Sequence, residues 1–265
     1  MSWYRARALG ITVGRMGEDG GFDPAFDFRS EGGDDPDSDS PTLREYHRRL
    51  WSKPLPNGDP FELEITFDKR RRRYFLHHPS LRDESYLTSD SAMQTWTRPG
   101  WQRWMRKITE QVPESDLKEF LTIAHQIGGK VLFPGMEING RTINQERGTN
   151  PKIRDRFDLT LECIRLRYLG EDSPLDEVLR RYWAFFELFV DFKGYTDFFL
   201  LQDLVSDGSS AVKFLIPFAD FTTSPFPDDV EAYQEYRRNG IRFIEARNRR
   251  MADQVPRSRQ AGSRR

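Results

Sequence analysis

The stretch "NGRTINQERGTNPKIRDRFDLTLECIRLRYLG", residues 139–170, decides the expected fold because its apolar residues recur with a helical period on two sides. The first side carries Ile153, Phe157, Leu161, Ile164 and Tyr168, and the second carries Leu159, Cys163 and Leu166. A helix that is apolar on two sides packs between layers of a fold. Asn150 is a favourable N-cap and Pro151 suits the first helical position. The pattern therefore predicts one buried helix over residues 151–169, capped at Asn150.

Short strands are predicted around this helix. Residues 61–67 alternate with period two, and residues 73–78 can pair with them as an antiparallel hairpin. Three further apolar runs are predicted as strands, residues 130–135, 141–143 and 211–218. The first two of these are joined near Asn139-Gly140, a pair that favours tight turns.

Helical patterns cover most of the remaining chain. They span residues 41–51, 114–127, 174–192 and 227–254, and residues 194–205 remain ambiguous between helix and strand. Asp39 or Ser40 is the predicted cap of the first helix. Strands lie early and near the end of the chain, with helices between them. This order favours an α+β fold, with a small, mostly antiparallel sheet and packed helices in a single domain.

The length of 265 residues suits one globular domain, which we place at residues 21–253. Residues 1–20 are expected to be a disordered extension, and residues 254–265 a disordered basic tail. The most apolar stretch, "WAFFELFV", is too short to cross a bilayer, and no signal peptide is recognisable. A soluble, cytoplasmic protein without membrane contact is therefore expected.

Charge is nearly balanced over the chain but unevenly distributed. The net charge is −1, while residues 23–45 carry eight acids and two bases, and residues 247–265 carry seven bases and one acid. The whole molecule is therefore not expected to attract polyanions. The run "KRRRR", residues 69–73, is predicted as a solvated hairpin tip. Phosphate contacts from it and from the basic tail leave nucleic acid as an open alternative partner.

Four blocks of the sequence together resemble an uncharacterised bacterial family, a domain of unknown function. The blocks are "SPTLREYHRRLWSKPLPNG", "TINQERGTNPKIRDRFDLTLECIRLRYLG", "FFLLQDLV" and "YRRNGIRFIEARNRR". The resemblance covers roughly residues 24–250. It implies a bacterial origin and one domain over that span, and it implies no activity.

The start of the predicted helix is the first candidate site. Arginine and amide side chains gather there, namely Arg141, Asn144, Arg147, Asn150 and Arg154. A helix N-terminus offers free N–H groups and a partial positive charge, so these side chains indicate a site for phosphate or another anion. The alternative is that Asn150 only caps the helix and the arginines pair with neighbouring acids.

Catalytic candidates are few. Asp155 and Asp158 lie on one side of the predicted helix together with Glu162, a set that can hold Mg²⁺. Pairing of these acids with arginines three or four residues away explains them equally well, so no metal site is predicted. His47 is a candidate general base, and its alternative is a structural histidine.

The sequence contains no Walker loop, no GxGxxG and no GxSxG motif, so the common nucleotide-binding and serine-hydrolase classes are disfavoured. Two hypotheses remain. The protein binds, or acts on, a phosphorylated or nucleotide-like ligand at the 141–158 corner, or it is a noncatalytic protein-interaction module. Whether it is an enzyme, its cofactor and its oligomeric state are not indicated by the sequence.

Overall fold

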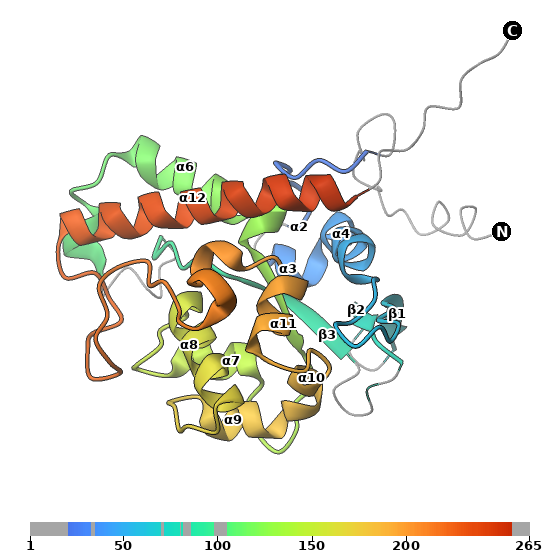
Figure 1. Cartoon of the computed structure of the whole chain (residues 1–265). Helices are drawn as coiled ribbons and strands as arrows, with labels where there is room; N and C mark the ends of the chain where they lie inside the picture. Colours follow the sequence, from blue (N-terminus) through green and yellow to red (C-terminus); the bar gives the residue numbers. More distant parts are fainter. Residues whose placement is uncertain are drawn as a thin grey trace, which may run out of the picture.

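The computed structural model describes residues 21–32, 35–69, 72–79, 81, 86–97 and 105–255 (Figure 1). The predicted disordered extension and nearly all of the predicted tail lie outside these residues, as do Arg70 and Arg71 of the predicted hairpin tip. Gln254 and Val255 are described: Gln254 ends the last helix, and Val255 is buried. Residues 254 and 255 of the predicted tail thus belong to the described part of the chain.

A four-stranded antiparallel sheet forms one part of the fold. Its strands are β1 (Glu64–Asp68), β2 (Arg73–His77), β3 (Tyr86–Ser91) and β4 (Lys130–Pro134), in the order β1-β2-β3-β4. The predicted hairpin is confirmed, with Ile65 opposite Leu76 and Phe67 opposite Tyr74. With helices packed around this sheet, the α+β class and the single domain are also confirmed.

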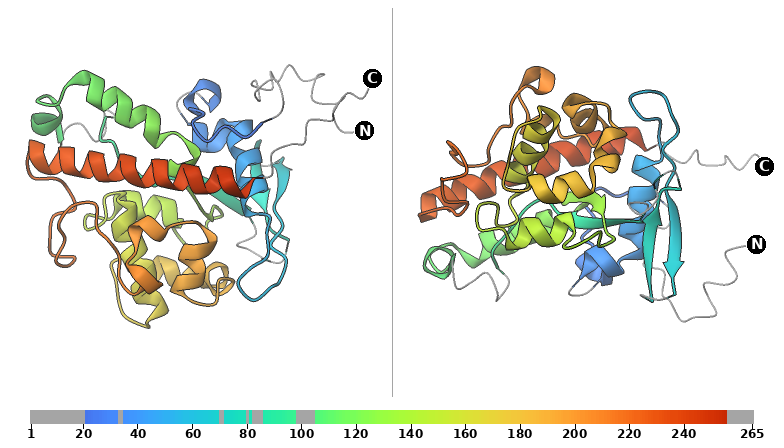
Figure 2. Two further views of the ribbon diagram at one scale, coloured as in Figure 1. Left: turned by 45° about the horizontal axis from the view of Figure 1, so that its top comes forward. Right: turned by 90° about the horizontal axis from the view of Figure 1, so that it is seen from below.

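Helices make up the larger part. They are α2 (Arg29–Gly32), α3 (Pro36–Asp39), α4 (Pro41–Trp51), α6 (Glu114–Ala124), α7 (Ile143–Thr149), α8 (Phe157–Tyr168), α9 (Asp176–Arg181), α10 (Trp183–Glu187), α11 (Phe192–Phe198) and α12 (Val230–Gln254), with 3₁₀ turns η2 (Ile127–Gly129), η3 (Gln202–Leu204) and η4 (Asp207–Ser209). Helices α6 and α12 lie side by side along one side of the molecule (Figure 2). Gly128 of η2 is required where it approaches α12, because a Cβ there would lie 2.4 Å from the carbonyl oxygen of Ile244.

Helix α4 begins with the kind of N-cap that the sequence predicted. The Ser40 side chain accepts a hydrogen bond from the backbone N–H of Leu43 at 3.1 Å, and Pro41 occupies the first helical position. Asp39 instead belongs to the preceding short helix, α3. Of the two predicted capping residues, Ser40 is therefore the one that caps α4.

The prediction of one helix over residues 151–169 is wrong. Helix α7 ends at Thr149, Asn150 is its C-cap, and the chain turns before α8 begins. Asn150 precedes a proline, which disfavours the helical conformation at that residue. Arg154 and Asp155 then adopt left-handed φ angles of 46° and 67°. The part of the prediction that holds is the burial of α8 on more than one side, because Phe157, Leu159, Leu161, Cys163 and Ile164 are all buried.

The predicted strand at residues 141–143 is also wrong, because Ile143 begins α7. The Thr142 side chain accepts from the backbone N–H of Gln145 at 3.2 Å, and the Gln145 side chain accepts from the N–H of Thr142 at 2.9 Å. This reciprocal pair is a capping box, which stabilises the start of a helix.

Two other elements differ from prediction. The helix expected over residues 174–192 is divided into α9, α10 and the start of α11, and the division after α10 is marked by Val190 at φ 70°. The strand expected over residues 211–218 is absent, apart from a single bridge between Val205 and Val212. Its backbone N–H groups bond elsewhere: Lys213 donates to the carbonyl of Leu204 at 2.8 Å and Leu215 to the Asp158 carboxylate at 3.0 Å.

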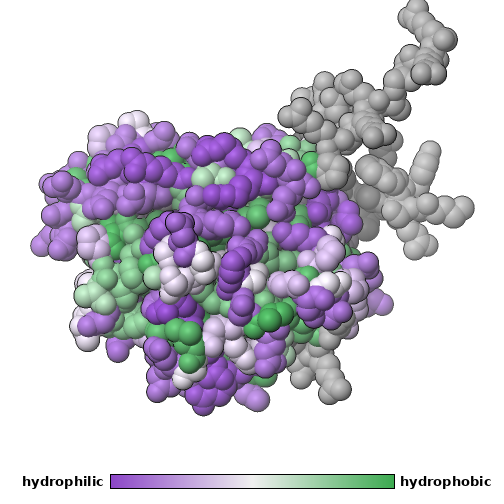
Figure 3. Space-filling model, in the orientation of Figure 1, coloured by the Kyte–Doolittle hydropathy of each residue, from purple (hydrophilic) through white to green (hydrophobic). Residues whose placement is uncertain are grey.

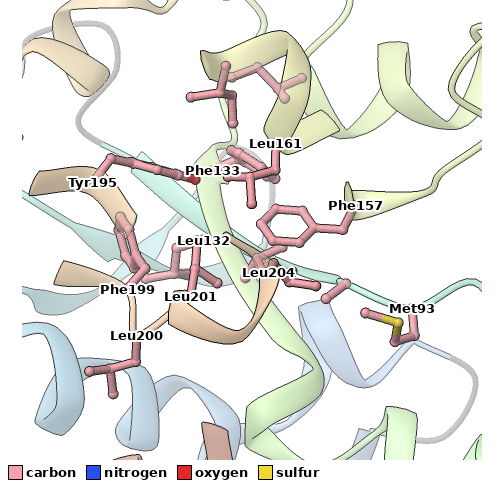
Figure 4. Packing of buried hydrophobic residues seen from close by; sticks show 14 of the residues in the cluster. Met93, Leu132, Phe133, Phe157, Leu161, Tyr195, Phe199, Leu200, Leu201 and Leu204 are labelled. Carbon is pink, nitrogen blue, oxygen red and sulfur yellow. The ribbon is translucent and has the colours of Figure 1, made fainter. Parts of the chain in front are cut away.

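The core joins the sheet to the helices through aromatic side chains. Figure 4 shows Phe133 of β4 and Phe157 of α8 pointing toward one another, and their ring centroids lie 6.4 Å apart. Tyr195 and Phe199 extend this cluster toward α11, with centroids 5.1 Å apart. Pairs at these distances add to the free energy of burial. The sheet, α8 and α11 are thus held in one core, and the polar sites lie in or around it.

Candidate functional site

The side chains of Arg141, Asn144, Arg147 and Asn150 bond to different parts of the protein, and Arg154 lies half-buried in the turn before α8. Arg141 is exposed and donates to the Thr149 hydroxyl at 3.0 Å. The Asn144 side chain donates to the Thr88 hydroxyl of β3 at 3.4 Å. Asn150 donates through its side chain to the carbonyl of Pro174 at 3.1 Å. Each side chain bonds to a different part of the protein.

Arg147 points into the core, and its guanidinium is completely buried. It forms ion pairs with Asp90 and Asp155, donates through Nε to the Thr160 hydroxyl at 3.2 Å, and donates to the carbonyl of Ser91 at 3.1 Å. These internal acceptors occupy the N–H groups of Arg147 that the sequence analysis predicted to bind an anion. No helix starts at Asn150, so the free N–H groups expected there for an anion are also missing. Ligand binding at this corner stays a prediction that the geometry does not support.

Asp155 therefore shares one arginine with a second carboxylate. Arg147 lies between Asp90 and Asp155, and Gln94 also donates to Asp155 at 3.1 Å. Burial raises the pKa of Asp90, and the negative charge of Asp155 acts in the same direction, whereas Arg147 opposes both. This shared arrangement holds the turn before α8 against β3.

Asp158 and Arg156 form a second buried ion pair, and both side chains are completely inaccessible to solvent. The contact is bidentate, with Nε to Oδ1 at 3.1 Å and Nη2 to Oδ2 at 2.5 Å. Arg156 also donates to the carbonyl of Pro225 at 3.1 Å, and Asp158 accepts from the backbone of Leu215. The pair connects the segment before α12, through Leu215 and Pro225, to the start of α8. Its role is therefore structural.

His47 lies in the core between two fixed neighbours. Its Nδ1 accepts from the indole N–H of Trp51 at 3.0 Å, so the neutral ring carries its proton on Nε2, which lies 3.1 Å from the hydroxyl of Ser89. Burial lowers the pKa of His47 to about 3, and the positive charge of Arg247 contributes in the same direction. Because His47 is fully buried, this geometry supports the structural alternative for the residue.

Metal ligation finds no support in the described residues. No three of their histidine, cysteine, aspartate or glutamate side chains are grouped closely enough to hold an ion. Glu162 instead accepts two hydrogen bonds from Arg165, at 2.7 and 2.8 Å. This pairing with an arginine three residues away is the alternative to a metal site that the sequence left open. Asp158 pairs with Arg156, two residues before it in the chain.

An open groove of about 440 Å³ lies between α12 and residues 203–215. Its ten lining residues are Asp203, Leu204, Lys213, Phe214, Leu215, Asn239, Arg242, Phe243, Ala246 and Arg249. Figure 1 draws α12 in red and the segment that contains residues 203–215 in orange. Figure 3 shows a hydrophilic band along α12 and paler, partly hydrophobic surface below it. Both walls of the groove therefore carry charged and apolar side chains.

Positive charge dominates this groove. Lys213, Arg242 and Arg249 are exposed, and no described residue forms an ion pair or side-chain hydrogen bond with any of them. Among the described lining residues the one acid is Asp203, and Arg250 binds it, with Nη2 2.7 Å from Oδ1. The basic side chains of the groove are thus uncompensated, in contrast to Arg147 and Arg156 in the core.

Comparison with known proteins places the chain in a family. Residues 22–251 match the model of a family described as "Family of unknown function (DUF6994)". The chain belongs to the DUF6994 family. The span agrees with the predicted resemblance over roughly residues 24–250. No curated protein and no solved structure shows a significant match to the chain.

The DUF6994 match covers both the buried ion pairs and the groove, so it does not favour one over the other. Among the described residues, no helix is long and apolar enough to cross a membrane. The sequence prediction did not single out the groove residues Lys213, Arg242 and Arg249. One signal was available: Arg238, Arg242 and Arg249 recur at helical spacing on α12, a long helix that was predicted correctly.

Proposed function

We propose that this DUF6994 protein binds a phosphate-bearing ligand in the groove between α12 and residues 203–215. The observation that carries the proposal is the set of three exposed cations, Lys213, Arg242 and Arg249, that have no acidic partner among the described residues. Guanidinium groups match phosphate geometry through paired N–H donors, and lysine adds a compact charge. The proposal keeps the predicted ligand class and moves it to a different site.

The dimensions of the groove agree with this ligand class. A volume of about 440 Å³ lies in the range of small-molecule sites, roughly 300–1,000 Å³. The floor includes Leu204, Leu215 and Phe243, which are all buried and therefore fixed by the core. A rigid apolar floor with charged side chains at its rim orients a ligand that carries both kinds of surface.

Titration calorimetry with inorganic tripolyphosphate tests the proposal. The wild-type protein is compared with the double variant Arg242→Ala/Arg249→Ala and with Arg141→Ala as a control. Arg141 is an exposed arginine before α7 and does not line the groove. We expect the double variant to bind at least about tenfold more weakly, because it loses two charge-assisted contacts. The control is expected to bind like the wild type.

Two results would reject the proposal. One is a wild-type protein that does not bind tripolyphosphate, and the other is a double variant that binds as tightly as the wild type. Binding is also expected to weaken as salt is raised from about 0.05 to 0.5 M, because exposed charges are screened. A thermal melt of each variant shows whether it is folded.

The alternative, a protein-interaction module, is favoured by one observation. The edge strand β1 and its neighbour β2 present large exposed hydrophobic side chains, Ile65, Phe67 and Tyr74, with exposed fractions of 37%, 47% and 38%. Edge strands with apolar side chains pair readily with other chains. This alternative gains weight if tripolyphosphate does not bind the wild-type protein.

A further inference from the structure

Asn239 gives the groove a polar group that a phosphate does not need. Its side-chain Nδ2 donates to the carbonyl of Leu215 at 2.8 Å, which fixes the orientation of the amide. No described residue donates to Oδ1, and Nδ2 has a second hydrogen. Asn239 thus presents a free acceptor, Oδ1, and a free donor hydrogen on Nδ2 side by side in the groove. The polar edges of nucleobases present the complementary pair, and asparagine is a common reader of that pair.

Phe214 gives the same groove an aromatic surface. It is partly exposed and lies between Lys213 and Leu215 in the wall opposite α12. Phe214 contacts Phe218, with ring centroids 4.5 Å apart, and Phe218 packs on Phe221 at 5.2 Å. A ring that is held in place in this way is suited to stack on a flat ligand group.

The three features lie in one groove and describe one kind of molecule. Phosphate alone leaves Phe214 and Asn239 unused, and a sugar phosphate has no flat group that can stack on Phe214. A nucleotide carries a flat base with a polar edge, joined to phosphate. Building on the proposed function, we infer that the ligand is a nucleotide whose base packs on Phe214 and contacts the Asn239 amide, while its phosphates lie on the basic rim.

The experiment compares nucleotides with a ligand that has phosphates and no base. ATP, GTP, CTP, UTP and inorganic tripolyphosphate are titrated into the wild-type protein and into Phe214→Ala. The tightest nucleotide is expected to bind the wild type at least about tenfold more tightly than tripolyphosphate does, which is the size of a base-stacking contribution. Phe214→Ala is expected to lose that advantage and to keep its affinity for tripolyphosphate.

Two further variants separate the role of the ring from a general loss of structure. Phe214→Leu keeps the apolar contact with Phe218 and removes the ring, so it is expected to lose the advantage in the same way as Phe214→Ala while melting close to the wild type. Asn239→Leu keeps the side-chain size and removes the amide, so it is expected to lower nucleotide affinity and leave tripolyphosphate affinity unchanged.

The outcomes distinguish this inference from the proposed function. If all four nucleotides bind no more tightly than tripolyphosphate, and Arg242→Ala/Arg249→Ala weakens every ligand, the base contact is rejected while the anion groove stands. The same conclusion follows if Phe214→Leu weakens nucleotides and tripolyphosphate equally. If neither tripolyphosphate nor any nucleotide binds the wild-type protein, both proposals fall.

Discussion

Arg147 of α7 and Asp90 of β3 form an ion pair around a guanidinium that is completely buried. The same guanidinium bonds to Asp155 and Thr160, so one side chain connects the sheet, the turn after α7 and the first turns of α8. Removing one partner of such a group leaves uncompensated charge in the core, which costs more than the contact itself contributes.

Arg147→Ala is therefore expected to lower the free energy of unfolding by about 3–5 kcal/mol. Urea denaturation measures this change. Arg141→Ala is the matched control, because Arg141 belongs to the same predicted corner but is exposed, and its removal is expected to change stability by less than about 0.5 kcal/mol. Equal stabilities for the two variants would contradict the structural role of Arg147.

His47 makes the stability of the fold sensitive to acid. Its pKa is about 3 in the folded protein and about 6.5 in an unfolded chain. Between these two pH values the unfolded state binds a proton that the folded state does not bind, so stability falls as pH is lowered. The largest slope from this residue is about 1.4 kcal/mol per pH unit.

His47→Gln removes this titration. We expect it to be less stable than the wild type at pH 7.5, because its contacts with Trp51 and Ser89 are altered, and the difference is expected to narrow toward pH 5. Unfolding by urea at each pH measures both curves. Other titrating groups, including His125, are common to the two proteins and cancel in the difference. Parallel curves would show that His47 takes up a proton in the folded state.

The elements that the sequence predicted correctly are those with a strong local pattern. The hairpin of β1 and β2 has period-two alternation, and α4 and α12 have clear starts at Ser40 and Asp229. In α12 the helical pattern continues through Gly240, whose missing side chain leaves room for Met93 and Phe120. Where the local pattern and the packing agree, the sequence is sufficient.

The failures occur where contacts distant in sequence decide the conformation. Nothing in the periodicity of residues 151–169 shows that Arg147 needs the carbonyl of Asp155, a contact of 3.1 Å that accompanies the turn. The capping box of Thr142 and Gln145 was a visible local signal that the strand prediction overlooked. The groove depends on residues 203–215 meeting α12, and that approach is fixed by packing and by the buried Asp158 rather than by any motif.

Val190 occupies an unfavourable backbone conformation at the break after α10. Its φ is 70° and its side chain is 62% exposed, so a β-branched residue is held in the left-handed region without a compensating burial of its side chain. This conformation costs on the order of 1–3 kcal/mol for such a residue. Asparagine tolerates it better.

Val190→Asn is therefore expected to stabilise the protein by about 1 kcal/mol, or roughly 2–4 °C in Tm for a chain of this size. Differential scanning calorimetry measures the shift. Val190→Ile, which keeps the β-branch, serves as the control and is expected to give no gain. A lower Tm for Val190→Asn than for Val190→Ile would show that this residue does not hold a left-handed conformation in solution.

Asp203 offers a last test of the groove, because it is the one acid that the described part of the chain contributes to the lining and it forms an ion pair with Arg250. Asp203→Asn removes a negative charge from the site and releases Arg250 from its ion pair. If phosphates bind there, both effects strengthen binding, and tripolyphosphate affinity is expected to rise several-fold at low salt and less at high salt. Glu64→Gln is the matched control, since Glu64 is an exposed acid of β1 that does not line the groove. It changes the net charge by the same amount. Equal gains for the two variants in titration calorimetry would attribute the effect to net charge, whereas a gain confined to Asp203→Asn assigns it to the groove.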